Sequence, residues 1–161
     1  MAAYNYKGYL IKILHDAPLG DYVIPEKFIA FNTPNNLVST TDVEAWRDAN
    51  GVLHRETIEK PTPKVEFNTP YIDSKYLQEV LDEIRKRYVN TSEKKLHMKV
   101  WSEEKNDYIT QYFYLTSDVN FTIYKKIVRK EWVGGVLTDR TYFLYNPIRF
   151  AFIGYGSNSN S

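Results

Sequence analysis

Apolar and polar residues alternate along most of the chain, which is the pattern of strands with one buried and one wet face. Proline cannot donate a hydrogen bond to a β-ladder. Pro25 therefore favours an edge or irregular segment for residues 22–31, and Pro61 and Pro63 are expected to stop the strand predicted over residues 52–58. The pattern predicts strands over residues 6–14, 22–31, 38–47, 52–58, 64–68, 95–100, 108–115, 119–124, 142–145 and 148–153.

One segment has helical rather than strand periodicity. Asp73 or Ser74 is a suitable N-cap for a helix that runs to about Tyr88. A single apolar stripe at helical spacing predicts that this helix lies against a sheet. The stripe consists of Tyr76, Leu77, Val80, Leu81, Ile84 and Tyr88.

Turn residues separate the strands and limit the fold class. Asp48-Ala49-Asn50-Gly51 predicts a hairpin turn, and Ser102–Asp107 and Gly134-Gly135 predict two more. Several strands, one helix and several more strands indicate an α+β fold, with an antiparallel sandwich or barrel of two packed sheets flanked by one helix. We expect a single domain over 1–153 and a flexible Gly/Ser/Asn-rich tail over 154–161.

Composition narrows the possible partners. The chain of 161 residues holds 14 Tyr, 8 Phe and 3 Trp, and such aromatic residues favour strands and protein interfaces. Its net charge of +1 creates no global field that would attract nucleic acid or an acidic membrane. It has no Cys, its N-terminus does not look like a signal peptide, and no membrane anchor is predicted.

No residue pattern indicates catalysis. His15, His54 and His97 lie far apart in the sequence, without a partner at metal-ligand spacing, and are expected to be surface residues. Phosphate-binding and nucleophile-elbow motifs are absent, and no pair of carboxylates is singled out. We therefore predict no catalytic residue, no metal and no cofactor, and a chain that is not an enzyme.

Two stretches combine charge with tryptophan. Lys125, Lys126, Arg129 and Lys130, followed by Trp132, are compatible with a nucleic-acid or phosphate contact, but a solvated strand end and turn is favoured at this net charge. Trp46 and Arg47 are residue types enriched at interface hot spots. The long segment 32–51 is poorly suited to burial in the hydrophobic core of its own chain. The predicted assembly interface comprises Trp46, Arg47, Asn50, Gly51 and Arg55.

The order of these segments along the chain resembles that in a known protein family. Residues 42–58, the alternating strand Lys64–Asn68, the helix 76–87 and the strand 106–114 are similar to the small tail proteins of phages and prophages of Gram-positive bacteria. The resemblance covers residues 38–153 and implies the tail-tube fold shared by tube subunits, distal tail proteins and baseplate adaptors. It rests on order and spacing rather than on a chemically demanding motif.

The resemblance also implies a function. Subunits of that kind form a hexameric ring around a lumen that conducts DNA, without reading its sequence, and rings stack through an extended loop, here 32–51 or the N-terminal segment. The implied partners are other copies of the chain and neighbouring tail or baseplate proteins, in a virion tail assembled in the cytoplasm of a bacterial host.

Two alternatives remain open. A monomeric β-sandwich module that binds carbohydrate or peptide would use an aromatic sheet face. A small hydrolase would need a deep pocket with two coupled carboxylates or a histidine–acid pair.

Overall fold

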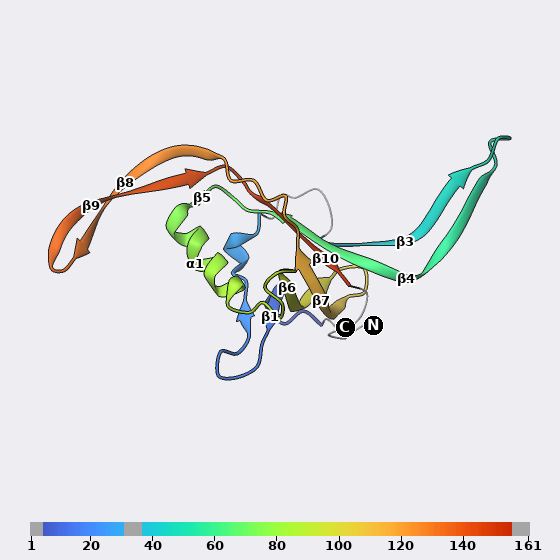
Figure 1. Ribbon diagram of the computed structural model, residues 1–161, viewed down its shortest axis with the longest axis horizontal. Helices are drawn as coiled ribbons and strands as arrows, with labels where there is room; N and C mark the ends of the chain where they lie inside the picture. Colours follow the sequence, from blue (N-terminus) through green and yellow to red (C-terminus); the bar gives the residue numbers. More distant parts are fainter. Residues whose placement is uncertain (1–4, 31–36, 156–161) are drawn as a thin grey trace.

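The computed structural model describes residues 5–30 and 37–155, and for residues 40–46 and 54–61 it describes the backbone alone. A compact body carries two long hairpins that project from opposite sides (Figure 1). The predicted α+β class is confirmed, because two antiparallel sheets and a single α-helix are present among the described residues.

The larger sheet has seven strands in the order β2-β1-β6-β7-β10-β4-β3. The last strand of the chain, β10, lies between β7 and β4, so Phe152 faces Leu115 on one side and Val65 on the other. The bounds of the seven strands are β1 Ile11–Leu14, β2 Tyr22–Val23, β3 Val38–Arg47, β4 Leu53–Asn68, β6 Lys95–Ser102, β7 Asp107–Leu115 and β10 Arg149–Gly154.

The smaller sheet has three strands in the order β5-β9-β8. Their bounds are β5 Ile72–Asp73, β8 Ile123–Val133 and β9 Val136–Tyr145. The β8–β9 hairpin is an excursion of the chain between β7 and β10, which are adjacent strands of the larger sheet. The larger sheet is therefore continuous from β7 to β10, and the β8–β9 hairpin is not part of it.

The core lies where β1, β4, β6, β7 and β10 face the helix. Five phenylalanine side chains are almost fully buried there. The rings of all but Phe113 form a chain of contacts, in which the Phe67 and Phe150 centroids are 5.7 Å apart. Burial of aromatic side chains supplies much of the free energy of folding of a small core. The five are Phe28, Phe67, Phe113, Phe150 and Phe152.

The helix α1, Ser74–Arg85, begins at its predicted N-cap. The side chain of Asp73 accepts a hydrogen bond of 2.8 Å from the backbone N–H of Tyr76, which satisfies one free donor of the first turn. Leu77, Val80, Leu81 and Ile84 are buried, as the apolar stripe predicts. The helix ends at Arg85, about one turn before Tyr88.

Several predicted boundaries are wrong: the strand predicted over 6–14 covers only Ile11–Leu14, and the strand predicted over 119–124 begins only at Ile123, where β8 starts. Residues 22–31 form only the two-residue β2 and a 3₁₀ turn, Glu26–Phe28, because Pro25 ends the pairing. Pro61 and Pro63 do not end a strand, since β4 continues through both to Asn68. The register between β3 and β4 shifts between Thr41 and Val43, opposite this stretch, and proline is tolerated at such irregular positions.

Candidate functional site

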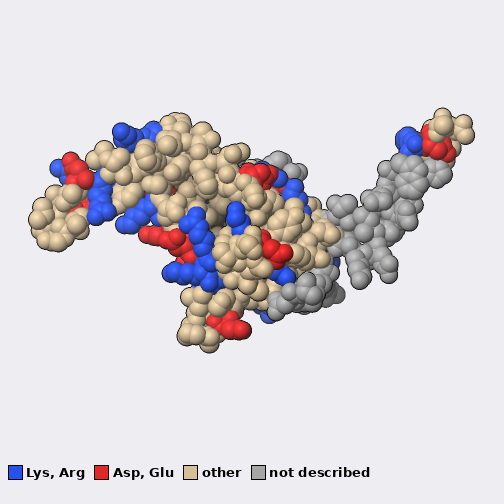
Figure 2. Space-filling view, viewed as in Figure 1, with Lys and Arg blue, Asp and Glu red and all other residues tan. Residues whose placement is uncertain are grey.

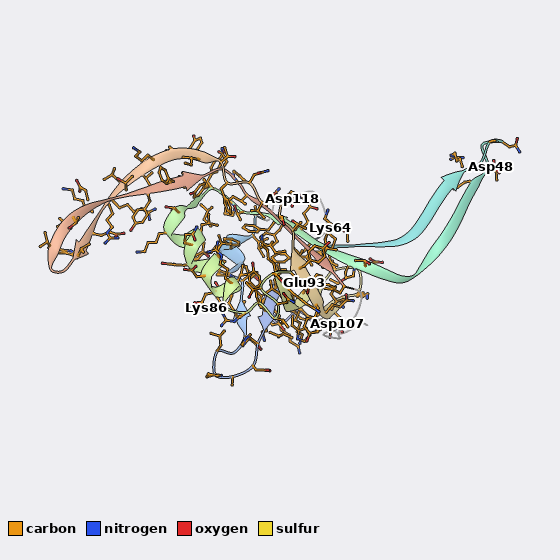
Figure 3. The ribbon with its side chains drawn as sticks, viewed as in Figure 1. Asp48, Lys64, Lys86, Glu93, Asp107 and Asp118 are labelled. Atoms are coloured by element: carbon orange, nitrogen blue, oxygen red, sulfur yellow. The ribbon has the colours of Figure 1, made fainter. Side chains whose placement is uncertain are left out.

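The β3–β4 hairpin presents the predicted assembly residues at its far end. Asp48, labelled at the tip in Figure 3, accepts hydrogen bonds from the backbone N–H groups of Asn50 and Val52 at 2.9 and 3.0 Å. Arg47 donates to the carbonyl oxygen of Gly51 at 3.0 Å, and Gly51 has a φ of +80°, which favours glycine. The predicted turn is confirmed, and Arg47, Asn50 and Gly51 lie together in it.

The other two predicted interface residues lie on the same hairpin. In the backbone register Trp46 faces His54, and Arg55 faces Ala45. The side chains of Trp46 and Arg55 lie outside the described residues. The structure thus brings the five positions to one end of one arm, and their role in assembly stays a prediction.

The β8–β9 hairpin is an arm that the sequence pattern missed. The basic cluster 125–130 is not a strand end and turn, because β8 continues without interruption to Val133, where Gly134-Gly135 makes the predicted turn. No described apolar side chain of the arm is fully buried. Trp132 is 74% exposed, Val136 64%, Val128 61% and Leu137 49%.

The register divides the arm into two faces. One face, here called the outer face, holds Lys126, Val128, Lys130 and Trp132 of β8 together with the residues opposite them, Phe143, Thr141, Asp139 and Leu137 of β9. Residues directly opposite in an antiparallel pair share a face, so apolar and basic side chains alternate along this surface. Phe121, Ile123 and Tyr124 add exposed apolar surface near the base.

The inner face of the arm is tied to the start of α1. Arg129 pairs with Asp73 at 3.3 Å, Lys75 lies 3.8 Å from Glu131, and the Tyr142 hydroxyl donates to Glu131 at 2.7 Å. This hydrogen bond lowers the pKa of Glu131 and raises that of Tyr142. These polar contacts, at Arg129 and Glu131 in the half of β8 nearer the turn, attach the inner face of the arm to the body and leave the outer face to solvent.

Charge is unevenly divided between the arm and the rest of the chain. Residues 123–145 contain five Lys or Arg and two Asp or Glu, a net charge of +3, whereas the remaining sixteen basic and eighteen acidic residues give −2. Figure 2 shows basic side chains along the arm and a tip of other residue types. The arm is thus a basic, apolar projection from a slightly acidic body.

A cleft of about 620 Å³ opens beside the β1–β2 loop. Of the histidines expected at the surface, His15 is exposed, His97 is only partly exposed, and the side chain of His54 lies outside the described residues. Leu14 of β1 pairs with His97 of β6, so that His15 and His97 both line the cleft. Asp16 and Asp21 enter from the loop, and Tyr88, Val89 and Tyr112 complete the lining. Nothing in the sequence spacing reveals this group, since only strand pairing assembles it.

His97 forms part of the wall of the cleft. Its ring stacks on Tyr112 at 4.4 Å, and its Nε2 atom is buried without a hydrogen-bond partner. Burial lowers the pKa of His97, an effect that Asp21 partly opposes, so the ring is neutral near pH 7. Neutral His97 does not offset the negative charge that Asp16 and Asp21 give the cleft.

The lining of the cleft is suited to binding a cationic group. Aspartate and aromatic side chains are suited to a cationic group, through charge and through contact with ring faces. In the described part of the chain, no group of three or more His, Asp and Glu residues could hold a metal ion. Nor is any described helix long and apolar enough to cross a membrane.

The arms, the body and the cleft all lie within the range of residues that matches one family model. Residues 1–155 match the model of DUF6711, described as a family of unknown function. The chain belongs to the DUF6711 family. No curated protein and no solved structure matches it. The match spans the body and both hairpins.

Proposed function

We propose that this member of DUF6711 is a structural subunit that assembles with other copies of itself. The observation that carries the proposal is the outer face of the β8–β9 arm, where Trp132, Val128 and Leu137 are about half exposed or more. Several large apolar side chains exposed on one face indicate a protein interface. Tryptophan is also the residue type most enriched at interface hot spots.

The shape of the arm adds a second argument. Eleven residues of β8 span about 35 Å, and a two-stranded hairpin is only marginally stable by itself in water. A neighbouring molecule that covers the outer face would stabilise it. The lone edge of β8 also offers unpaired backbone groups that a neighbour can cover.

The placement of the two arms suggests how the copies are arranged. The β3–β4 and β8–β9 hairpins project from opposite sides of the body (Figure 1). A subunit with different contacts on two sides associates head to tail, which gives a closed ring when the rotation permits. This arrangement fits a ring subunit.

The resemblance to small phage tail proteins supports the proposal that such a ring belongs to a tail or tail-like particle. The subunit would act as part of the tube, of its end or of a baseplate adaptor, with neighbouring tail proteins as partners and DNA passing through the lumen. Its site of action would be the virion tail, after assembly in the host cytoplasm.

Solution mass and electron microscopy test the proposal. The wild type is expected to gain mass reversibly with concentration in sedimentation analysis and to show rings or stacks in micrographs. The double variant Val128→Ser, Trp132→Ser should remain monomeric and folded, because both residues are exposed. Val23→Ser, which removes an exposed apolar residue from the body, is the matched control.

A wild type that stays monomeric at every concentration would contradict the proposal. If that monomer bound glycans or extended peptides on an array, the binding-module function would replace it. Equal association of the double variant and the wild type would show that the outer face is not the interface.

A further inference from the structure

The arm and the cleft of one chain cannot meet. The arm is tied to the N-terminal end of α1 through Asp73 and Lys75, whereas Tyr88 and Val89 of the cleft follow its C-terminal end. The twelve-residue helix separates the two by about 18 Å. The arm also points away from the β1–β2 loop, which is the lowest part of the view in Figure 1. Any contact between them must join two molecules.

The cleft has the charge that a basic arm requires. Of the described residues that line it, Asp16 and Asp21 are acidic and none is Lys or Arg. Asp21 uses one carboxylate oxygen to accept the N–H of His15, and this bond holds the loop in place. Figure 2 shows the β1–β2 loop with acidic and uncharged surface. Oppositely charged surfaces steer association and fix its register.

The tip of the arm has the complementary chemistry. Lys130 and Trp132 lie two residues apart on the outer face, next to the turn at Gly134-Gly135. Successive residues of one strand face are about 7 Å apart, so a cation and a large aromatic ring enter a pocket together. The volume of the cleft, about 620 Å³, lies within the range of binding pockets that enclose such groups.

We infer that the β8–β9 arm of one copy docks in the His15–Asp16–Asp21–Tyr88 cleft of a second copy, with Lys130 beside the aspartates and Trp132 against Tyr88. The inference rests on the proposed assembly function and names the surface that carries it. Because each molecule offers an arm at one place and a cleft at another, the contact is heterologous and continues from copy to copy.

Disulfide cross-linking tests the contact directly, since the chain has no native cysteine. Asp16→Cys and Lys130→Cys proteins are mixed and oxidised, and a mixed dimer containing one of each is expected. Lys105→Cys, an exposed lysine on the β6–β7 turn, replaces Asp16→Cys as the matched control and should give little mixed dimer with Lys130→Cys.

Charge reversal supplies a second measurement. Lys130→Asp and Asp16→Lys should each raise the apparent Kd of self-association about tenfold or more, because like charges across an interface repel. The two changes in one chain should restore association toward the wild-type value. Circular dichroism of each variant confirms that the exposed substitutions leave the fold intact.

The outcomes separate this inference from the proposed function. A wild type that assembles while the Asp16–Lys130 cross-link stays at the control level, and the double reversal restores nothing, overturns the docking contact and leaves the assembly function standing. A monomeric wild type without a cross-link overturns both. If Lys130→Asp abolishes binding of a single-stranded oligonucleotide and leaves self-association unchanged, the arm is a nucleic-acid surface and the inference fails.

Discussion

Two consecutive hairpins of this chain have similar lengths and very different surroundings. The β6–β7 hairpin has strands of 8 and 9 residues, and β8–β9 has strands of 11 and 10. Leu96, Met98, Val100 and Phe113 of the first are fully buried, whereas Val128, Trp132 and Leu137 of the second are exposed. Alternation of apolar residues is therefore not enough to bury a hairpin.

The neighbours of each hairpin explain the difference. β6 pairs with β1 and β7 pairs with β10, so the first hairpin lies in the middle of the larger sheet. In the described structure β8 pairs with no strand except β9, and β9 pairs otherwise with only the two residues of β5. The first hairpin contributes to the core, and the outer face of the second stays exposed in the described structure.

The largest expected contrast comes from one aromatic side chain in each hairpin. Phe113→Ala should lower the free energy of unfolding by about 3–5 kcal/mol, because it opens a cavity at a fully buried site. Trp132→Ala should change the stability of the monomer by about 0.5 kcal/mol or less, since Trp132 is 74% exposed. Urea unfolding at a concentration where the protein is monomeric measures both values. Equal losses would mean that the arm belongs to the core.

A smaller effect is expected where β10 closes the sheet beside β7. A Cβ atom on Gly154 would lie 2.7 Å from Cγ of Pro63, too close for two carbon atoms. Gly154→Ala should therefore destabilise the protein by about 1–3 kcal/mol through overpacking. Pro63→Ala in the same chain removes the opposing ring atoms and should recover most of the loss. Thermal unfolding of the single and double variants forms the cycle, and a double variant as unstable as Gly154→Ala would disprove the clash.

Asp73 tests the joint between the helix and the arm. Asp73→Ala removes the N-cap of α1 and should lower the free energy of unfolding by about 1 kcal/mol. Asp73→Asn keeps a capping oxygen and loses only the ion pair with the half-exposed Arg129, so it should be nearly as stable as the wild type. If Asn were as damaging as Ala in chemical denaturation, the pairing with the arm, not the cap, would be the stabilising contact.

The smallest expected effect is a pH dependence of the free energy of unfolding, which comes from His97 in the β6–β7 hairpin. Burial lowers the pKa of His97 in β6 from 6.5, so the unfolded chain takes up this proton before the folded chain does. The stabilising contribution of neutral His97 is thus complete above pH 6.5 and declines as pH falls from there through the folded pKa. The stability difference between the wild type and His97→Gln should shift with pH in that range. A difference that stays constant would show that His97 has the same pKa in both states.

Local features of the fold were predictable because neighbouring residues decide them. The strand over 38–47, the turn at Asp48–Gly51 and the helix that begins after Asp73 occur as the pattern predicts. A capping side chain or a glycine with positive φ acts within a few residues of itself. The five predicted interface positions were brought to one arm for the same reason, since a hairpin joins sequence neighbours.

Long-range features were missed because they depend on pairing. The strand through Pro61 and Pro63 continues only because β3 and β10 lie beside it. The β8–β9 arm was predicted as a solvated strand end, because its basic residues look the same in a turn and on an exposed face. His15 and His97, which the sequence separates, share a cleft through the pairing of β1 with β6.

The sequence by itself determined where strands alternate, where turns occur and where the helix begins, because these follow from side-chain periodicity, backbone freedom and local hydrogen bonds. Only the tertiary structure decided which alternating hairpin is covered. Alternation gives a strand two unlike faces but does not name what packs on the apolar one. In this chain the apolar face of β6–β7 packs in one buried cluster with α1. The outer face of β8–β9 has no such cover among the described residues.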